Sequence, residues 1–437
     1  MTARKPVLFD EALKIAIKQI NDDPSLFGKK ITLVRDLRGR IRVLLPRKPS
    51  KSKNLDQFKN DIANALGAYG YPADQMVLFE DDLVQKGGKS LLSDARLLPN
   101  NETDLEIYLL DRQIIGQDWM RGELKRKTKN PRITFFGIKG GVGRSTVISI
   151  WAWWLAKQGK KILIFDLDLE SPGVSSTLLP QDFLPDFGIV DWFVESGVGQ
   201  SKNVEKWMIG SSPIASGLPG DIHVVPSFGS KTGDYLPKLA RCYSEVDEEG
   251  SLSWAERVQK MVERMEISQK PDLVILDSRA GLHDIAAVLV TRMDAENLLF
   301  AVDSPQTWKA YSFLFQHWKN HPHVNDFRRR LQFVAGMVPE TDRKQYLERF
   351  REHAWDVFRD SLYDEVTPEQ TEYFSFDSDD EDAPHFPIPV FWHRALQEFD
   401  PVTSPDGVDE KTAHDALDFF IERVNRLVSA TVGEDWK

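Results

Sequence analysis

The chain has 437 residues, of which 41% are apolar and 28% charged, the composition of an ordinary globular protein. Its single cysteine, Cys242, excludes a disulfide framework within the chain and argues against zinc or iron–sulfur sites rich in cysteine. The first residues are polar and no run of 18 apolar residues occurs, so we expect a cytoplasmic protein with no membrane-bound segment.

The net charge of −11 is unevenly distributed along the chain. Residues 1–132 contain 25 Lys and Arg against 18 Asp and Glu, whereas the remainder contains 31 against 49. A basic segment therefore precedes an acidic one. Two interpretations stay open: ordinary surface charge with a contact between the two parts or between subunits, or a basic face that binds nucleic acid or an acidic partner.

Residues 1–128 are predicted to form a separate small α+β domain. The spacing of apolar residues predicts helices at 9–20 and 55–66, and two β-rich runs at 31–34 and 41–45 flank a Gly39 turn as in a hairpin. Further strands are predicted at 75–79 and 105–110. This domain is the expected binding site of an unidentified protein partner.

Basic residues gather on the predicted hairpin and the loop after it. No aromatic residues are interleaved with them to stack on bases, so DNA is a weaker expectation than a protein partner. The members of this predicted basic patch are Arg35, Arg38, Arg40, Arg42, Arg47, Lys48, Lys51 and Lys53.

The charged segment at 121–132, RGELKRKTKNPR, is almost free of apolar residues. It predicts an interdomain linker or a short exposed helix, with 129–132 as the end of the linker. The second domain is then expected to span residues 133–432.

A glycine-rich segment opens this second domain. It reads KGGVGRST at 139–146, and it lies between an apolar run at 133–136, a helix-like run at 146–157 and a second apolar run at 162–165. Strand, glycine loop, helix and strand make a βαβ unit whose loop is suited to hold a phosphate.

The residue types in this loop have physical reasons. Gly140, Gly141 and Gly143 permit backbone conformations closed to residues with a Cβ, so amide groups can surround an anion. The N-terminus of the following helix adds unpaired amides and a favourable dipole. The alternative is a glycine turn that only joins a strand to a helix. Such a turn does not require the cations and hydroxyls that the loop also contains. The remaining residues of the loop are Lys139, Val142, Arg144, Ser145 and Thr146.

Acidic residues follow two of the apolar runs. Asp166 and Asp168 come directly after 162–165, and Asp277 follows the run at 273–276. Carboxylates at the C-terminal ends of parallel strands face the ligand crevice of an open α/β sheet. Asp277 can therefore hold a water on a Mg²⁺ ion whose other ligand is the Ser145 hydroxyl. A turn or helix-capping aspartate is the structural alternative for Asp166 and Asp168.

KGGVGRST resembles the deviant Walker A loop, KGGVGK[ST], of the ParA/MinD group of P-loop ATPases, and PDLVILDSRAGLHD at 271–284 resembles the group's Walker B strand and switch. The resemblance covers residues 132–430. It implies a mostly parallel, doubly wound α/β sheet, ATP and Mg²⁺ as ligands, and a homodimer that sandwiches ATP.

The resemblance also implies roles for single residues. Lys139 would reach the partner's ATP, residues 140–146 would hold the phosphates, and Asp168 would position the attacking water. Asp166 would order Mg²⁺ through water, and the Gly281 amide would be available to the γ-phosphate. Candidates beside the adenine ring are Met337, Pro339 and Pro389.

Two residues depart from the group's pattern. Arg144 stands where the group has a lysine on the β- and γ-phosphates, and arginine is longer and forked. We therefore expect phosphate binding to survive and hydrolysis to be slow or stimulated by a partner. Arg279 stands where proline is common, either as a third cation near the phosphates or as a surface residue.

The C-terminal segment at 411–428 places its apolar residues on one face of a helix. It lacks the lysine-rich polar face of a membrane-binding helix, so we expect it to pack against the sheet.

The resemblance implies an ATP-dependent dimerisation switch that acts on a partner protein or assembly. KGGVGR-type variants resemble components of bacterial multi-gene systems, anti-phage defence included. Two alternatives remain: a non-catalytic scaffold locked to its nucleotide because Arg144 has abolished turnover, and a partition-type ATPase that binds DNA non-specifically.

Overall fold

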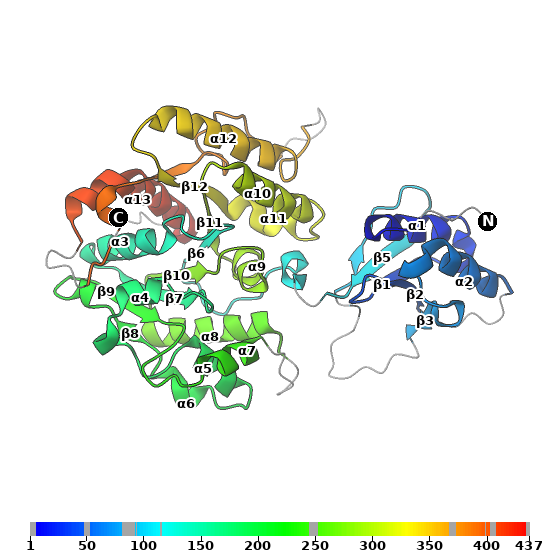
Figure 1. Ribbon diagram of the computed structural model, residues 1–437, viewed down its shortest axis with the longest axis horizontal. Helices are drawn as coiled ribbons and strands as arrows, with labels where there is room; N and C mark the ends of the chain where they lie inside the picture. Colours follow the sequence, from blue (N-terminus) through cyan, green and yellow to red (C-terminus); the bar gives the residue numbers. More distant parts are fainter. Residues whose placement is uncertain are drawn as a thin grey trace. The chain divides into compact units, whose positions relative to one another are not determined.

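The computed structural model describes residues 6–47, 53–80, 92, 94–113, 116–243, 252–366, 373–397, 399–402 and 408–433. The chain folds into two compact units, Met1–Gln117 and Asp118–Lys437 (Figure 1). Within the described residues, no helix is both long and apolar enough to cross a lipid bilayer.

The first unit is a five-stranded mixed sheet with two helices. The sheet order is β3-β2-β1-β5-β4, in which β1 and β2 form an antiparallel hairpin and β1 also pairs with β5 in parallel. The predicted hairpin and both predicted helices are confirmed. The elements are α1 (Phe9–Asn21), β1 (Lys30–Arg35), β2 (Ile41–Leu45), α2 (Lys53–Leu66), β3 (Val77–Phe79), β4 (Arg96–Leu97) and β5 (Glu106–Asp111).

Arginines of the predicted basic patch make contacts within this unit. Arg35 Nε donates to Asp111 at 2.8 Å, and Arg40 pairs with Asp36 at 3.0 Å. The Arg42 guanidinium lies over the Tyr71 ring, 4.2 Å from its centroid. The hairpin charge is therefore partly neutralised internally. Lys48, Lys51 and the Lys53 side chain lie outside the described residues.

The second unit is built on an eight-stranded sheet in the order β13-β12-β11-β6-β10-β7-β9-β8, with only β8 antiparallel to its neighbour. Helices pack on both faces of this sheet (Figure 1). This confirms the predicted doubly wound α/β class. The strands are β6 (Arg132–Gly137), β7 (Lys161–Leu167), β8 (Gly210–Ser211), β9 (Asp221–Val225), β10 (Leu273–Ser278), β11 (Glu296–Ala301), β12 (Leu331–Val338) and β13 (Ile388–Phe391).

The helices divide between the two faces because successive strand residues point to opposite sides. Ile133, Ile164 and Ile275 share one core with α3, α4 and α13, whereas Phe136, Leu163 and Val274 pack on the opposite face. The packing of the C-terminal helix on the sheet is confirmed. The helices are α3 (Arg144–Lys157), α4 (Val174–Leu178), α5 (Ile189–Ser196), α6 (Lys202–Glu205), α7 (Tyr235–Cys242), α8 (Trp254–Gln269), α9 (Asp284–Thr291), α10 (Pro305–Trp318), α11 (Val324–Phe327), α12 (Arg343–Arg359) and α13 (Glu410–Val432).

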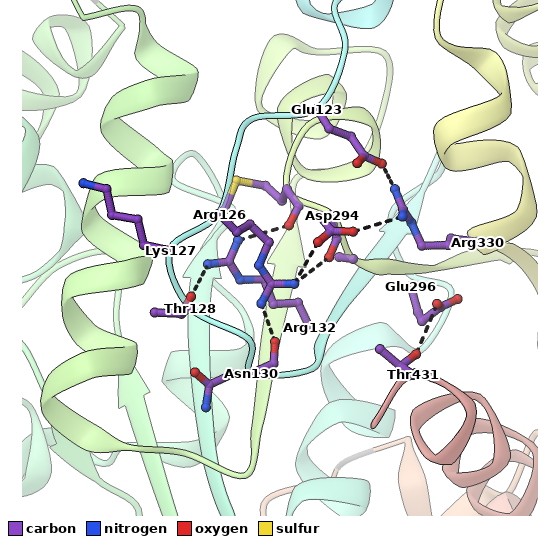
Figure 2. A network of polar contacts seen from close by, with 12 residues as sticks. Glu123, Arg126, Lys127, Thr128, Asn130, Arg132, Asp294, Glu296, Arg330 and Thr431 are labelled. Carbon is purple, nitrogen blue, oxygen red and sulfur yellow. Dashed lines mark hydrogen bonds and ion pairs between the residues drawn. The ribbon is translucent and has the colours of Figure 1, made fainter. Parts of the chain in front are cut away.

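The charged segment before β6 is part of the second unit, so the division of the chain falls earlier than the predicted 128–132. Arg126 Nη1 lies 3.1 Å from Asp294 (Figure 2). The Lys127 amide donates to Glu263 at 2.7 Å. Arg132 is fully buried in a bidentate pair with Glu266. The expectation of an exposed linker is therefore wrong. The segment packs on the second unit through ion pairs and hydrogen bonds rather than through apolar side chains.

A carboxylate at the foot of β11 should make stability depend on pH. Glu296 accepts a hydrogen bond from Thr431 of α13 at 3.3 Å (Figure 2). Burial raises its pKa to about 7, opposed by the Thr431 bond and assisted by Asp294. The folded chain thus holds this proton more tightly than the unfolded chain, so stability falls as pH rises from about 4.5 to 7.

We therefore expect Glu296→Gln to be more stabilising at pH 8 than at pH 5, by on the order of 2 kcal/mol. The glutamine oxygen can still accept the Thr431 hydroxyl, while the cost of burying a charge disappears. Urea unfolding of both proteins at both pH values measures the difference. An equal effect at the two pH values would contradict the assignment.

Candidate functional site

The glycine-rich segment connects the central strand β6 to helix α3. Gly141 and Gly143 have φ values of 71° and 88°, in the left-handed region that favours glycine. Gly143 is the residue before α3, and its carbonyl accepts the Val147 amide at 3.0 Å. The loop therefore takes the backbone shape that its glycines predict, with the N-terminus of a 14-residue helix directly behind it.

The end of β12 packs closely against this loop. A Cβ added at Gly336 would lie 2.5 Å from the carbonyl oxygen of Val142, and one added at Gly143 would lie 3.8 Å from Met337 Cγ. Met337 is exposed and has a φ of 55°. The structure thus brings Met337 to the loop, whereas Pro339 lies half-buried just past β12 and Pro389 lies in β13.

Two of the predicted carboxylates lie side by side on neighbouring strands. β7 and β10 are parallel, and their register pairs Asp166 with Asp277. Both residues fall on the face that α3 covers, because alternate residues on the same strands, Ile164 and Ile275, pack in the α3 core. Both aspartates are almost completely buried.

Arg144, the first residue of α3, extends into this acidic cluster. Its guanidinium lies 3.8 Å from Asp168 Oδ2 and 3.8 Å from Asp277 Oδ1, and it donates a hydrogen bond to the Ser278 carbonyl. Its side chain is only 9% exposed. The structure therefore joins three predicted site residues, Arg144, Asp168 and Asp277, in direct contact.

Burial makes the negative charges of this cluster costly. It raises the pKa of Asp277, while Arg144 opposes the rise and the two other aspartates add to it. Burial likewise raises the pKa of Asp166 against two hydrogen bonds from Ser175, and that of Asp168 against Arg144. The three carboxylates are short of positive charge even with Arg144 among them.

Two carboxylate oxygens suit this cluster to a magnesium ion. Asp166 Oδ2 accepts the Ser175 amide at 2.9 Å and its hydroxyl, but the buried Asp166 Oδ1 and Asp277 Oδ1 have no hydrogen-bond partner in the described structure. The described residues contain no group of three or more His, Cys, Asp or Glu that could hold a metal alone. Mg²⁺ fits such a site, since it is usually held by one or two carboxylates together with substrate phosphates.

Ser145 lies near the same cluster. A Cβ added at Gly173 would lie 2.9 Å from Ser145 Oγ, and Gly173 directly precedes α4, whose Ser175 binds Asp166. The two hydroxyl-bearing residues and the carboxylate are thus linked through the start of α4. Thr146 follows Ser145 in the first turn of α3.

The remaining predictions have mixed outcomes. Lys139 is exposed at the start of the loop, as a contact to another molecule would require. The Gly281 amide, expected to be available to a phosphate, instead donates to the Gly137 carbonyl at 3.1 Å, because Gly281 has a φ of 92° that turns its loop back onto β6. Arg279 pairs with Glu170, its Nη1 lying 2.6 Å from that carboxylate, and its charge acts on the nearby Asp168.

The residues that support the site were not predicted from the sequence. They are Glu170, Gly173, Ser175, Ser278 and Gly336. Their roles depend on contacts that only the folded chain creates. The signals in the sequence were that Glu170 and Gly173 follow Asp168 closely and that Ser278 directly follows Asp277.

Comparison with known proteins gives a family match within this unit. Residues 133–304 match the model of the CobQ/CobB/MinD/ParA nucleotide binding domain. A comparison with curated proteins found no match.

Solved structures with a similar fold include pNOB8 ParA, with 16% identity over 69% of this chain and 97% of that one and a TM-score of 0.42. Cobyrinic acid a,c-diamide synthase from Mycobacterium smegmatis is 14% identical over 70% and 98%, with a TM-score of 0.39. A ParA family ATPase from Chlorobium tepidum TLS is 14% identical over 70% and 97%, with a TM-score of 0.40. Likenesses at this level assign no activity or partner. The family model, whose residues include the glycine loop and the three aspartates, shows that the chain carries a nucleotide binding domain of the CobQ/CobB/MinD/ParA family in residues 133–304.

Proposed function

We propose that the chain is an ATP-dependent switch that binds ATP with Mg²⁺, hydrolyses it slowly, and acts on a partner protein or assembly. One observation carries this proposal. A glycine loop at a helix N-terminus lies beside two buried carboxylates, Asp166 and Asp277, each with an oxygen that has no hydrogen-bond partner in the described structure. An anion and a cation bound next to one another satisfy both halves of this arrangement.

The chain's own residues divide the work as follows. The amides of residues 140–146 and the N-terminus of α3 bind the phosphates, and Arg144 supplies a fixed positive charge. Ser145 and Asp277 would hold Mg²⁺, with Asp166 ordering its water, and the ion would neutralise charge on the phosphates. Asp168, at the rim of the cluster, positions and activates the attacking water. Catalysis then rests on positioning and electrostatics.

Association of two subunits completes the switch. We propose that Lys139, which is exposed at the loop, reaches the nucleotide of a second copy and that hydrolysis releases the two copies. Residues 1–128 would carry the partner-binding surface. Assignment to a bacterial multi-gene defence system belongs to the same proposal and rests on the KGGVGR motif alone.

Single-turnover phosphate release from bound ATP tests the enzyme, and light scattering on the same samples tests association. We expect slow release of phosphate and a doubled mass with ATP and Mg²⁺, followed by return to the monomer. A nucleotide-locked scaffold is the second candidate, favoured by the contacts of Arg144 with Asp168 and Asp277. A scaffold predicts a mass that does not return to that of the monomer after ATP is added, and no phosphate release.

The packing of β12 on the loop gives a further prediction. Gly336→Ala should weaken ATP binding about tenfold or more, because the new methyl group meets the Val142 carbonyl and the loop must shift; overpacking of this kind costs about 1–3 kcal/mol. Calorimetry measures the affinity. Gly233→Ala is the matched control, since a Cβ there meets nothing within 4 Å. Unchanged affinity in a folded Gly336→Ala protein would show that the loop tolerates the shift.

A further inference from the structure

An ion pair joins the two loops that follow the carboxylate-bearing strands. Glu170 lies two residues after Asp168 beyond β7, and Arg279 lies two residues after Asp277 beyond β10. Arg279 Nη1 is 2.6 Å from Glu170 Oε1, with the side chains 33% and 25% exposed. The pair therefore links segments more than a hundred residues apart in sequence, directly outside the acidic cluster.

Glu170 is held by a second partner. The Tyr243 hydroxyl, just past the end of α7, donates to the same Glu170 Oε1 at 2.7 Å, and the Tyr235 hydroxyl at the start of α7 donates to the Leu169 carbonyl. The Tyr243 ring also packs edge-on against His283, with centroids 5.6 Å apart. Helix α7 thus fixes the first loop through two tyrosines and contacts the second through one of them.

The second loop is anchored differently. Its backbone is held by the Gly281 amide, which donates to Gly137, and by the Ser278 carbonyl, which accepts from Arg144. These contacts attach it to the end of β6 and to α3 rather than to the loop after β7. The Glu170–Arg279 pair is a direct side-chain ion pair between the two loops, in addition to the Tyr243–His283 and Arg144–Asp168 contacts.

From this geometry we propose that Glu170 and Arg279 are positioning residues that hold the two loops together and so keep Asp168 in register with Asp277. The proposal rests on the proposed function, because it names what aligns the water-positioning carboxylate with the metal-binding one. An isolated surface ion pair stabilises a fold very little. This pair acts instead on the relative motion of two loops, and that motion can be measured.

Amide hydrogen exchange of the full chain, without added nucleotide, is the direct test. Arg279→Glu should raise exchange about tenfold in residues 168–175, the loop that carries no substitution, because the introduced carboxylate would repel Glu170. Glu170→Arg should do the same in residues 278–283. The double variant that swaps the two charges, Glu170→Arg with Arg279→Glu, should return the hydrogen-exchange rates of both loops to within about threefold of wild type.

Controls separate positioning from general destabilisation. Arg264→Glu breaks a comparably exposed pair with Glu205 and should leave both loops unchanged. If a charge-reversal variant fails to fold, Arg279→Gln and Glu170→Gln apply the same test. We expect each to raise hydrogen exchange in the opposite loop about threefold. An opposite loop that keeps its wild-type exchange, or a double variant that does not recover, overturns the proposal.

Phosphate release distinguishes this proposal from the proposed function. In Arg279→Glu we expect single-turnover release to slow about tenfold while ATP affinity stays within about threefold of wild type. If exchange follows the pattern above but the wild type releases no phosphate, the positioning role holds and the enzyme assignment fails. If the wild type releases phosphate and Arg279→Glu releases it equally fast, the positioning role fails and the enzyme assignment holds.

Discussion

Asp168→Asn is expected to slow phosphate release by about 100-fold or more and to leave ATP affinity within about threefold of wild type. The side chain lies at the rim of the acidic cluster, 3.8 Å from Arg144 and next to the buried pair Asp166 and Asp277. An asparagine keeps the shape and cannot accept a proton from water. Because the substitution removes a negative charge, it does not weaken the attraction for a polyanion.

Rapid-quench measurement of bound ATP and released phosphate in a single turnover gives both quantities. Asp182→Asn, at an exposed position of the same unit, is the matched control and should behave as wild type. Equal loss of affinity and rate in Asp168→Asn would place Asp168 in binding rather than in hydrolysis. An unchanged rate would remove it from the mechanism.

The second large effect is expected from Arg144→Met, which should make the protein respond to Mg²⁺ without nucleotide. Arg144 is the cation in contact with Asp168 and Asp277, so its removal leaves a buried cluster of carboxylates without that charge. A divalent ion can then take its place, and ligand binding to the folded state raises the Tm. We expect a rise of about 3–8 °C in about 10 mM Mg²⁺ for the variant and little change for wild type.

Arg328→Met provides the comparison for this experiment. Arg328 is bound to Asp364 at 2.7 and 2.9 Å with a side chain 10% exposed, much like the 9% of Arg144, but it lies away from the glycine loop. Loss of its pair should lower the Tm without creating a response to Mg²⁺. Equal responses of wild type and Arg144→Met would show that Arg144 is not the counter-ion of the metal-binding carboxylates.

Apolar runs predicted most of the second unit. The strands around Ile133, Ile164 and Ile275 are continuous apolar segments buried on both faces, and such segments fit only a sheet covered by helices on both sides. The same argument placed Asp166 and Asp277 at strand ends, where the parallel register brings them together. Residue type and position relative to a strand were sufficient for these features.

What the sequence did not reveal depends on backbone direction and on distant partners. The charged segment before β6 has too few apolar residues to predict its packing, yet Arg126 and Arg132 bind carboxylates 134 and more residues away. The Gly281 amide meets the Gly137 carbonyl through a turn with a positive φ, and Arg279 finds its partner Glu170 on a distant loop; sequence spacing encodes neither contact. Ser175 reaches Asp166 only because α4 turns back over the end of β7.

Calorimetric titration of ATP into the wild-type protein, once with Mg²⁺ and once with EDTA, tests the central claim most directly. The glycine loop and the two carboxylates, each with an oxygen that has no hydrogen-bond partner in the described structure, predict a saturable heat with one ATP per chain, and an affinity at least about tenfold weaker in EDTA. The absence of heat in both titrations, or equal affinity in both, would contradict the account of this site.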